Sequence, residues 1–243
     1  MSRLAIAGYG LACYTIFVAT LAYFIGFMTD IAVPKSVDDG IDMPWPMAMA
    51  LDLSLIGLFA VQHTIMVRPG FKRILDSVLP RACERTTFVL ASSIVLMLLC
   101  ILWAPLPGTL WEATAPWLRG FLWTVCGFGW GLALVSTFQF DHFGLFGLRQ
   151  VWNHLRGQPP VAPAEFSIPY LYQWVRHPMM TGFLIAFWVM PDMSASQALL
   201  AAGLTLYIVL GTGHEERGLM REFGDNYRNY IATTPRFFPR FPR

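Results

Sequence analysis

The feature that most constrains the fold of this chain is a series of long apolar stretches that contain almost no charge. Only 13% of the 243 residues are charged, which is about half the share found in a soluble domain. A helix needs ~20 apolar residues to cross a ~30 Å hydrocarbon core. Four stretches come close to that length, at residues 4–28, 46–66, 87–104 and 117–138. We therefore expect an all-α, polytopic membrane bundle.

Residues 179–213 form a further apolar region that is interrupted at Met190-Pro191-Asp192. Proline removes a backbone donor and disfavours helix in the residue before it, so the region divides into limbs at 179–191 and 195–213. The first limb has only 13 residues, and either a full or a partial crossing fits that length. The prediction is five to six membrane helices, the last two forming a hairpin, followed by a cytoplasmic C-terminal helix.

The basic residues give the expected orientation. Fifteen of the seventeen fall on one side of the predicted spans: Arg3, five in residues 67–86, three in 139–178 and six after residue 213. Because Lys and Arg are enriched in cytoplasmic loops, that side and both termini should be cytoplasmic. A single crossing over 179–213 would place the six-arginine tail outside, so the hairpin is favoured.

Net charge and cysteine usage limit the function. A net charge of +2 gives no reason to expect a nucleic-acid partner. Four cysteines lie in or beside apolar stretches without metal-type spacing, so we expect core packing, no disulfide framework and no metal site. They are Cys13, Cys83, Cys100 and Cys126. The glycines at 127, 129 and 131 lie inside a predicted span, where small residues favour close helix packing rather than nucleotide binding.

Two polar clusters flank the predicted hairpin, which would return both of them to one membrane face. The first contains Tyr172 and Arg176-His177-Pro178. It fits either a simple helix start or an anion site at a helix N-terminus. The second begins with Glu215-Glu216 at the end of an apolar helix, where the dipole disfavours acids unless a cation compensates. A continued helix would place Glu216 and Tyr227 on one face.

The joint pattern resembles the integral-membrane methyltransferases, which include isoprenylcysteine carboxyl methyltransferase and bacterial phospholipid methyltransferases. The resemblance rests on Val175-Arg176-His177-Pro178, the hairpin, Glu215-Glu216, Phe223-Gly224, Tyr227, Tyr230 and Pro235-Arg236-Phe237. It implies a single domain over residues 1–243, with S-adenosylmethionine bound mainly by residues 139–243. The implied cofactor residues are Tyr172, Arg176, His177, Glu215, Glu216 and Tyr227. Arginine would suit the methionine carboxylate, and the glutamates would suit the ribose hydroxyls or the amino group.

Upstream segments are similar to the methanethiol S-methyltransferases and to a related membrane family linked to nitrogen-oxide metabolism. These segments are Gln62-His63 and residues 138–150, and they depart from the isoprenylcysteine enzymes. The resemblance implies conversion of methanethiol to dimethyl sulfide with release of S-adenosylhomocysteine, in a bacterial inner membrane. Two alternatives stay open: methylation of a lipid or prenyl carboxylate, and a non-enzymatic membrane protein of nitrogen-oxide respiration with haem on His63, His142 or His177.

Asp141-His142 could take part in removing the proton of a thiol. A cysteine-type thiol titrates near ~8.5, so thiol methylation benefits from a base. His142 could take the proton while Asp141 orients it. A plain interfacial pair is the other interpretation, and water or Tyr172 could also serve as the base. A buried His63 needs a polar partner, and a pocket role for it also stays open. Asp52 should reach the membrane interface or a polar partner.

Overall fold

The computed structural model describes residues 2–160 and 166–239, so Arg240 and Arg243 of the predicted basic tail lie outside it. The regular secondary structure of its described part is almost entirely helical, which confirms the all-α prediction. The chain divides into two compact units, and each is described by itself. The first holds the N-terminal helices, and the second holds the hairpin and the C-terminal segment.

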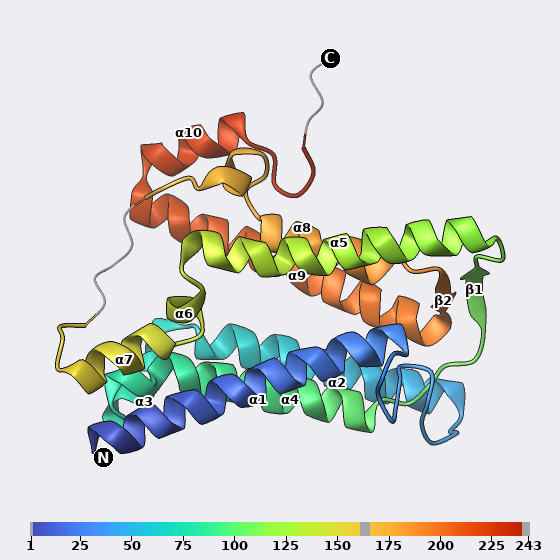
Figure 1. Cartoon of the computed structure of the whole chain (residues 1–243), viewed down its shortest axis with the longest axis horizontal. Helices are drawn as coiled ribbons and strands as arrows, with labels where there is room; N and C mark the ends of the chain where they lie inside the picture. Colours follow the sequence, from blue (N-terminus) through green and yellow to red (C-terminus); the bar gives the residue numbers. More distant parts are fainter. Residues whose placement is uncertain (1, 161–165, 240–243) are drawn as a thin grey trace. The chain divides into compact units, whose positions relative to one another are not determined.

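The first unit is built on three long apolar helices, with α4 packed against both α1 and α2 (Figure 1). Short helices α6 and α7 follow the fourth span in sequence, so no extended helix continues there. The elements are α1 (Arg3–Thr29), α2 (Trp45–Met66), α3 (Pro69–Val78), η1 (Arg81–Cys83), α4 (Glu84–Leu102), α6 (His142–Leu145) and α7 (Leu148–Arg156).

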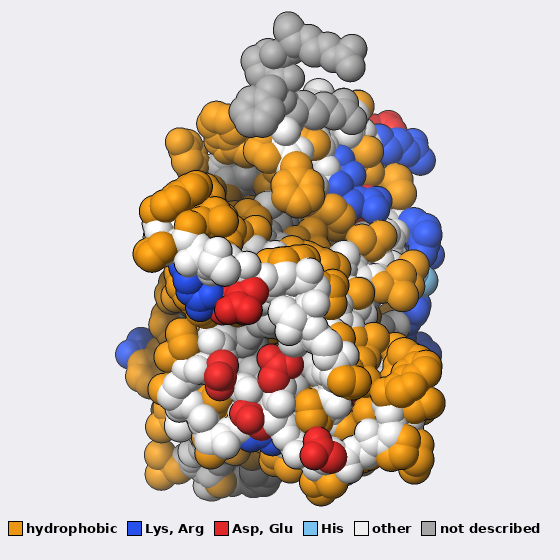
Figure 2. Space-filling model, turned by 90° about the vertical axis from the view of Figure 1, so that its right-hand side faces the viewer, with side chains coloured by type: hydrophobic (Ala, Val, Ile, Leu, Met, Phe, Trp, Pro, Cys, Tyr) orange, Lys and Arg blue, Asp and Glu red, His pale blue; other side chains and the backbone are white. Residues whose placement is uncertain are grey.

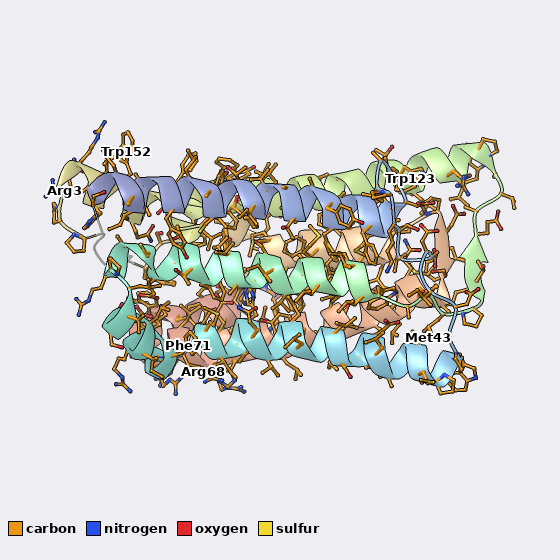
Figure 3. All side chains as sticks on the ribbon, turned by 90° about the horizontal axis from the view of Figure 1, so that it is seen from below. Arg3, Met43, Arg68, Phe71, Trp123 and Trp152 are labelled. Carbon is orange, nitrogen blue, oxygen red and sulfur yellow. The ribbon has the colours of Figure 1, made fainter. Side chains whose placement is uncertain are left out.

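Charge is distributed unevenly along this unit. Arg3 and Arg68 lie at one end of the long helices and Met43 lies at the other (Figure 3). Near Met43, the loop after α1 carries Asp38 and Asp39, and carboxylates gather on that end of the molecule (Figure 2). The separation of basic and acidic ends agrees with the one-sided distribution of basic residues in the sequence.

The second unit is organised around α8, which lies along α5 (Figure 1). Glycines permit the close approach: a Cβ on Gly129 would lie 2.7 Å from the Gly182 oxygen, and one on Gly182 would lie 2.5 Å from the Gly129 oxygen. The packing role predicted for the three glycines is confirmed for Gly129, but it is wrong for Gly127 and Gly131, where an added Cβ would meet no described atom within 4 Å. The elements are β1 (Thr109–Glu112), α5 (Pro116–Phe140), η2 (Tyr170–Gln173), α8 (Pro178–Trp188), β2 (Asp192–Ser194), most of α9 (Ala195–Phe223) and α10 (Asp225–Thr233).

The predicted hairpin is present, and its turn contains a structure that the sequence did not reveal. Trp188 of α8 donates through Nε1 to the Thr205 hydroxyl of α9 at 2.8 Å. Between these helices, β2 pairs antiparallel with β1. Five helices in the described residues are long and apolar enough to cross a membrane, while α8 has only 11 residues. The protein is an integral membrane protein.

The end of α9 differs from a continuous amphipathic tail. The helix runs to Phe223, further than the predicted 213, and then breaks at Gly224, whose φ of +56° suits glycine. A new helix, α10, starts at Asp225. Glu216 and Tyr227 therefore do not share one helix face, although both are buried.

Buried polar and sulfur groups follow the expectations from sequence. All four cysteines are buried and free. Asp52 is fully buried, and its Oδ1 accepts a hydrogen bond from the Ala104 backbone at 3.0 Å, so it has a polar partner, while its Oδ2 has no hydrogen-bond partner among the described residues.

Candidate active site

Glu216 is the centre of the polar cluster in the second unit. Its Oε1 accepts from Nε of Arg176 at 2.8 Å and lies 3.1 Å from Nε2 of His177. Its Oε2 accepts from Arg236. The Glu216 side chain is only 5% exposed, and a buried carboxylate is stable only when charged or polar partners surround it. Glu216 does not lie at a helix end as predicted, because α9 continues to Phe223, and two arginines compensate its buried charge.

The C-terminal segment is fastened to the start of α8 by backbone hydrogen bonds. The N–H groups of Arg176 and His177 donate to the carbonyls of Pro235 and Arg236 at 2.9 and 3.1 Å. The Arg176 guanidinium also donates to the carbonyls of residues 231 and 234. These two N–H groups and this guanidinium are therefore occupied within the protein, and Arg176 orders the site from inside.

His177 lies between the two glutamates. Its Nδ1 is 3.9 Å from Oε2 of Glu215, whose side chain is 55% exposed, in contrast to buried Glu216. Burial lowers the pKa of His177, and it outweighs the opposite influence of Glu215 and Glu216. A neutral imidazole beside an exposed carboxylate offers both a hydrogen-bond donor and acceptors to a polar ligand.

Tyrosines and a phenylalanine form the aromatic side of the cluster. The Tyr230 hydroxyl donates to the Tyr172 carbonyl, and the Phe166 ring meets Tyr227 and Tyr230 edge-on. Burial raises the pKa of Tyr172, and it raises that of Tyr227 to about 12. Both phenols stay protonated at neutral pH, so Tyr172 is poorly suited to act as a base.

Asp141 belongs to the same unit and follows the last residue of α5. The neighbouring Gln139 side chain accepts from the Leu171 backbone at 2.9 Å, and Phe140 meets the Tyr172 ring with centroids 4.4 Å apart. The end of α5 is thereby held against η2, whose Tyr172 is linked to Tyr230. The second unit thus contains Asp141 together with all six predicted cofactor residues.

The histidines of the first unit have different surroundings. His142 is 6% exposed, and its Nε2 lies 2.7 Å from the Tyr14 hydroxyl of α1. His63 is 3.2 Å from the Ser92 hydroxyl through Nδ1 and packs against the Phe88 ring. His63 therefore has the polar partner that burial demands.

Comparisons with known proteins match almost the whole chain. The family model described as NnrU protein matches residues 52–235. A methanethiol S-methyltransferase of Mycobacterium tuberculosis is 44% identical over 98% of each chain. Methanethiol S-methyltransferase 1 of Bradyrhizobium diazoefficiens is 46% identical over 95% of this chain and 81% of its own. The chain belongs to the methanethiol S-methyltransferase family. No solved structure matches it.

For this member of the methanethiol S-methyltransferase family, sequence reasoning missed some partners of the site. Arg236 was noted only as part of the closing motif, yet it binds Glu216. Arg236 could have been identified from the sequence, because the two adjacent carboxylates of Glu215-Glu216 predicted that a further cation lies close to them. Tyr14 was not found, since nothing in an apolar helix marks one tyrosine as the partner of a histidine 128 residues away.

Proposed function

We propose that this protein transfers a methyl group from S-adenosylmethionine to methanethiol. The observation that carries the proposal is the cluster around Glu216 and His177, in a chain that matches a relative named methanethiol S-methyltransferase over 98% of each chain. The whole chain would act as one methyltransferase domain, with the cofactor held mainly by residues 139–243.

The residues present fit the proposed cofactor by their chemistry. S-adenosylmethionine carries a carboxylate, an ammonium group, ribose hydroxyls and a flat adenine. The cluster supplies the partly exposed Arg236 for an anion and the exposed Glu215 for a cation or hydroxyls. The rings of Tyr172 and Tyr227 supply aromatic surface.

The geometry divides the cluster into two layers. Arg176 and Glu216 are buried and hold each other and the C-terminal segment. Glu215 is exposed, and the buried His177 lies between it and Glu216, so Glu215 and His177 are the groups that would contact the cofactor. The bound cofactor supplies an electrophilic methyl group on a sulfonium, and its transfer to a thiolate gives dimethyl sulfide and S-adenosylhomocysteine.

The protein's own contribution on the acceptor side is a base and fixed positioning. Methanethiol must lose its S–H proton, and we assign this proton to His142, with Asp141 next to it in the chain. Positioning alone can supply a large part of a rate enhancement, and a well-placed general base adds about 10²–10⁴-fold.

We also propose that the basic end faces the cytoplasm of a bacterial cell, with the protein in the inner membrane. The support is the one-sided distribution of Arg and Lys. Single cysteines introduced beside Arg3 and beside Met43 would test it with a membrane-impermeant maleimide on intact spheroplasts. Labelling at Met43 and protection at Arg3 is the expected result; the reverse would overturn the orientation.

Headspace gas chromatography tests the reaction. Purified protein in detergent, given methanethiol and S-adenosylmethionine, should release dimethyl sulfide, and the variant His142→Gln should release far less. Protein that binds the cofactor but forms no dimethyl sulfide would exclude methanethiol as the acceptor. A lipid extract supplied as acceptor in the same assay checks the alternative lipid substrate.

Calorimetry with S-adenosylhomocysteine tests the cofactor residues. Glu215→Gln and His177→Ala should each weaken binding directly, and Glu216→Ala should weaken it by releasing Arg176 and Arg236. Glu222→Gln is the matched control, because Glu222 is another exposed carboxylate on α9. Equal affinity for wild type and Glu215→Gln would remove Glu215 from the site.

A further inference from the structure

Helix α3 is amphipathic, and its apolar stripe is left largely uncovered by the described residues. The stripe consists of Phe71, Ile74, Leu75 and Val78, which follow the i, i+3, i+4, i+7 spacing of one helix face. Ile74 is 64% exposed and Val78 is 76% exposed, and no residue of α3 is buried. On the surface of a soluble domain, a stripe of this kind would face the core. In this protein it faces outward.

The polar side of α3 makes the contacts with the rest of the first unit. Lys72 forms an ion pair of 2.9 Å with Glu84, the first residue of α4. Asp76 lies 3.6 Å from Arg81 of η1. Each exposed residue of the apolar stripe follows one of these two charged residues by two positions, which turns it by about 200° around an ideal helix. The helix is therefore held through its charged side, and the occupant of its apolar side comes from outside the described residues.

The place of α3 in the chain puts the apolar stripe at the surface of the membrane. Helix α2, which is long and apolar enough to cross a membrane, ends at Met66, and α3 begins at Pro69. The Cα atoms of these two residues lie at most about 11 Å apart, at 3.8 Å per residue. Ile65 and Val67 flank the last residue of α2 and are 48% and 43% exposed. The exposed apolar surface of the span is thus followed directly in the chain by that of α3.

Two free guanidinium groups accompany the apolar stripe. Arg68 and Arg73 are exposed, and their side chains have no hydrogen-bond or ion-pair partner among the described residues. Arg68 and Phe71 lie at the end of the long helices that also carries Arg3 (Figure 3). The planar donors of an arginine match a phosphate group, and basic residues at a membrane surface favour anionic lipids. The charges beside the stripe therefore fit an anionic headgroup that is attached to an apolar chain.

We propose that α3 is an interfacial helix that docks on a leaflet containing anionic phospholipid. Ile74 and Val78 lie among the acyl chains just below the headgroups, and Arg68 and Arg73 bind a lipid phosphate at the surface. An isolated helix of 10 residues would be marginal in water. The attachment of α3 to α2 and its ion pair with α4 order it in advance. The inference concerns the lipid contacts of the first unit and does not depend on the reaction.

The first experiment measures the depth of α3 in a bilayer. The full chain is reconstituted in nanodiscs of phosphatidylcholine and phosphatidylglycerol, with a nitroxide spin label at Val78→Cys or, as the matched control, at Ser77→Cys. Ser77 is exposed and is turned by about 100° from Val78 around the helix. The native cysteines are buried, and wild type treated with the same label gives the background.

Collisions with two relaxation agents report the surroundings of each label. The label at Val78→Cys should collide mainly with oxygen, which concentrates in the acyl region, and the label at Ser77→Cys mainly with a water-soluble nickel chelate. Equal contact of the two labels with the nickel chelate would overturn the docking. Protection of the label at Val78→Cys from both agents would show that protein covers the apolar stripe, and would also overturn it.

The second experiment tests the two arginines. Native mass spectrometry of protein released from the same nanodiscs should show that wild type retains phosphatidylglycerol in preference to phosphatidylcholine. The double variant Arg68→Gln/Arg73→Gln should lower this preference by roughly tenfold. The control, Arg217→Gln/Arg228→Gln, removes two arginines that are each already bound to a neighbouring side chain, and it should keep the preference. An unchanged preference in the first double variant, or equal losses in both, would overturn the lipid site at α3.

Discussion

Two arginine–carboxylate sites flank α8 in the second unit, and they differ mainly in their exposure to water. After the helix, Asp192 binds Arg119 at 2.6 and 2.7 Å, with side chains 44% and 37% exposed. Before the helix, Arg176 binds Glu216 at 2.8 Å, with side chains 8% and 5% exposed. Exposed pairs contribute little to stability, whereas removing one member of a buried pair is costly. The same kind of ion pair thus contributes very differently to stability at the two sites.

The difference follows from what each site has to hold. Asp192 begins β2, and its pair with Arg119 closes the turn of the hairpin. Glu216 contacts Arg176, Arg236 and His177, and through Arg176 it is linked to the backbone of the C-terminal segment. If one bond at the turn is lost, a bond to water can replace it. Removal of Glu216, by contrast, leaves two arginines without their common carboxylate.

The largest expected effect is therefore that of Glu216→Ala. Breaking the buried network should lower the free energy of unfolding by about 3–5 kcal/mol and detach the C-terminal segment. Thermal unfolding in detergent measures the stability, and limited proteolysis measures exposure of the segment. The control, Asp192→Ala, should keep the segment protected; equal losses in the two variants would show that burial does not separate the sites.

A smaller effect is expected from the helix contact that joins the two sites. Gly129→Ala places a Cβ 2.7 Å from both the Gly182 oxygen and the Ala186 nitrogen, and such overpacking costs about 1–3 kcal/mol. Gly131→Ala on the same helix is the control, since no atom lies within 4 Å of its added carbon. If Gly129→Ala unfolds at the wild-type temperature, the ion pairs rather than this contact hold α8 in place.

The helical architecture of both sites could be predicted because it follows from local properties of the chain. Long apolar stretches need no partner to indicate a membrane helix, and the proline at 191 marks the hairpin turn where β2 is found. The clusters at Arg176-His177 and Glu215-Glu216 were visible because charged residues are rare in such a chain.

Contacts between distant residues could not be predicted in the same way. The pairing of β1 with β2 joins an exposed segment to one that contains the buried Met193, about 80 residues away, without a strong strand pattern in either. The pair of Tyr14 and His142 depends on how α1 packs, which hydropathy does not encode. Likewise, the sequence marked Arg176 as a possible ligand contact, whereas its guanidinium is bound within the protein.

Lowering the pH should destabilise the protein at the buried site rather than at the exposed site, because the buried site contains His177. The pKa of a histidine in the unfolded chain is about 6.5, and burial lowers it in the folded protein even though Glu215 and Glu216 oppose the shift. Between these two pKa values the unfolded state binds more protons, so stability falls as the pH is lowered. Thermal unfolding between about pH 7.5 and 5.5 should show this loss.

Substitutions identify His177 as the source of that slope. His177→Gln removes the titrating group and should flatten the pH dependence by up to about 1.4 kcal/mol for each unit of pKa difference. His154→Gln removes a histidine outside the cluster and should leave the wild-type slope. An unchanged slope in His177→Gln would mean that other groups at the buried site control its response to acid.

The smallest effect is expected at the exposed site. Asp192→Asn should cost about 0–1 kcal/mol, because water and counterions replace much of the interaction. Arg119 also keeps a bond of 3.1 Å to the Ala113 carbonyl, so the arginine is not left without a partner. The difference from wild type, measured by thermal unfolding in low salt, should shrink in about 1 M salt, where the screening length falls to about 3 Å. A loss above about 2 kcal/mol that salt does not reduce would contradict the comparison, because the turn would then behave like the buried network.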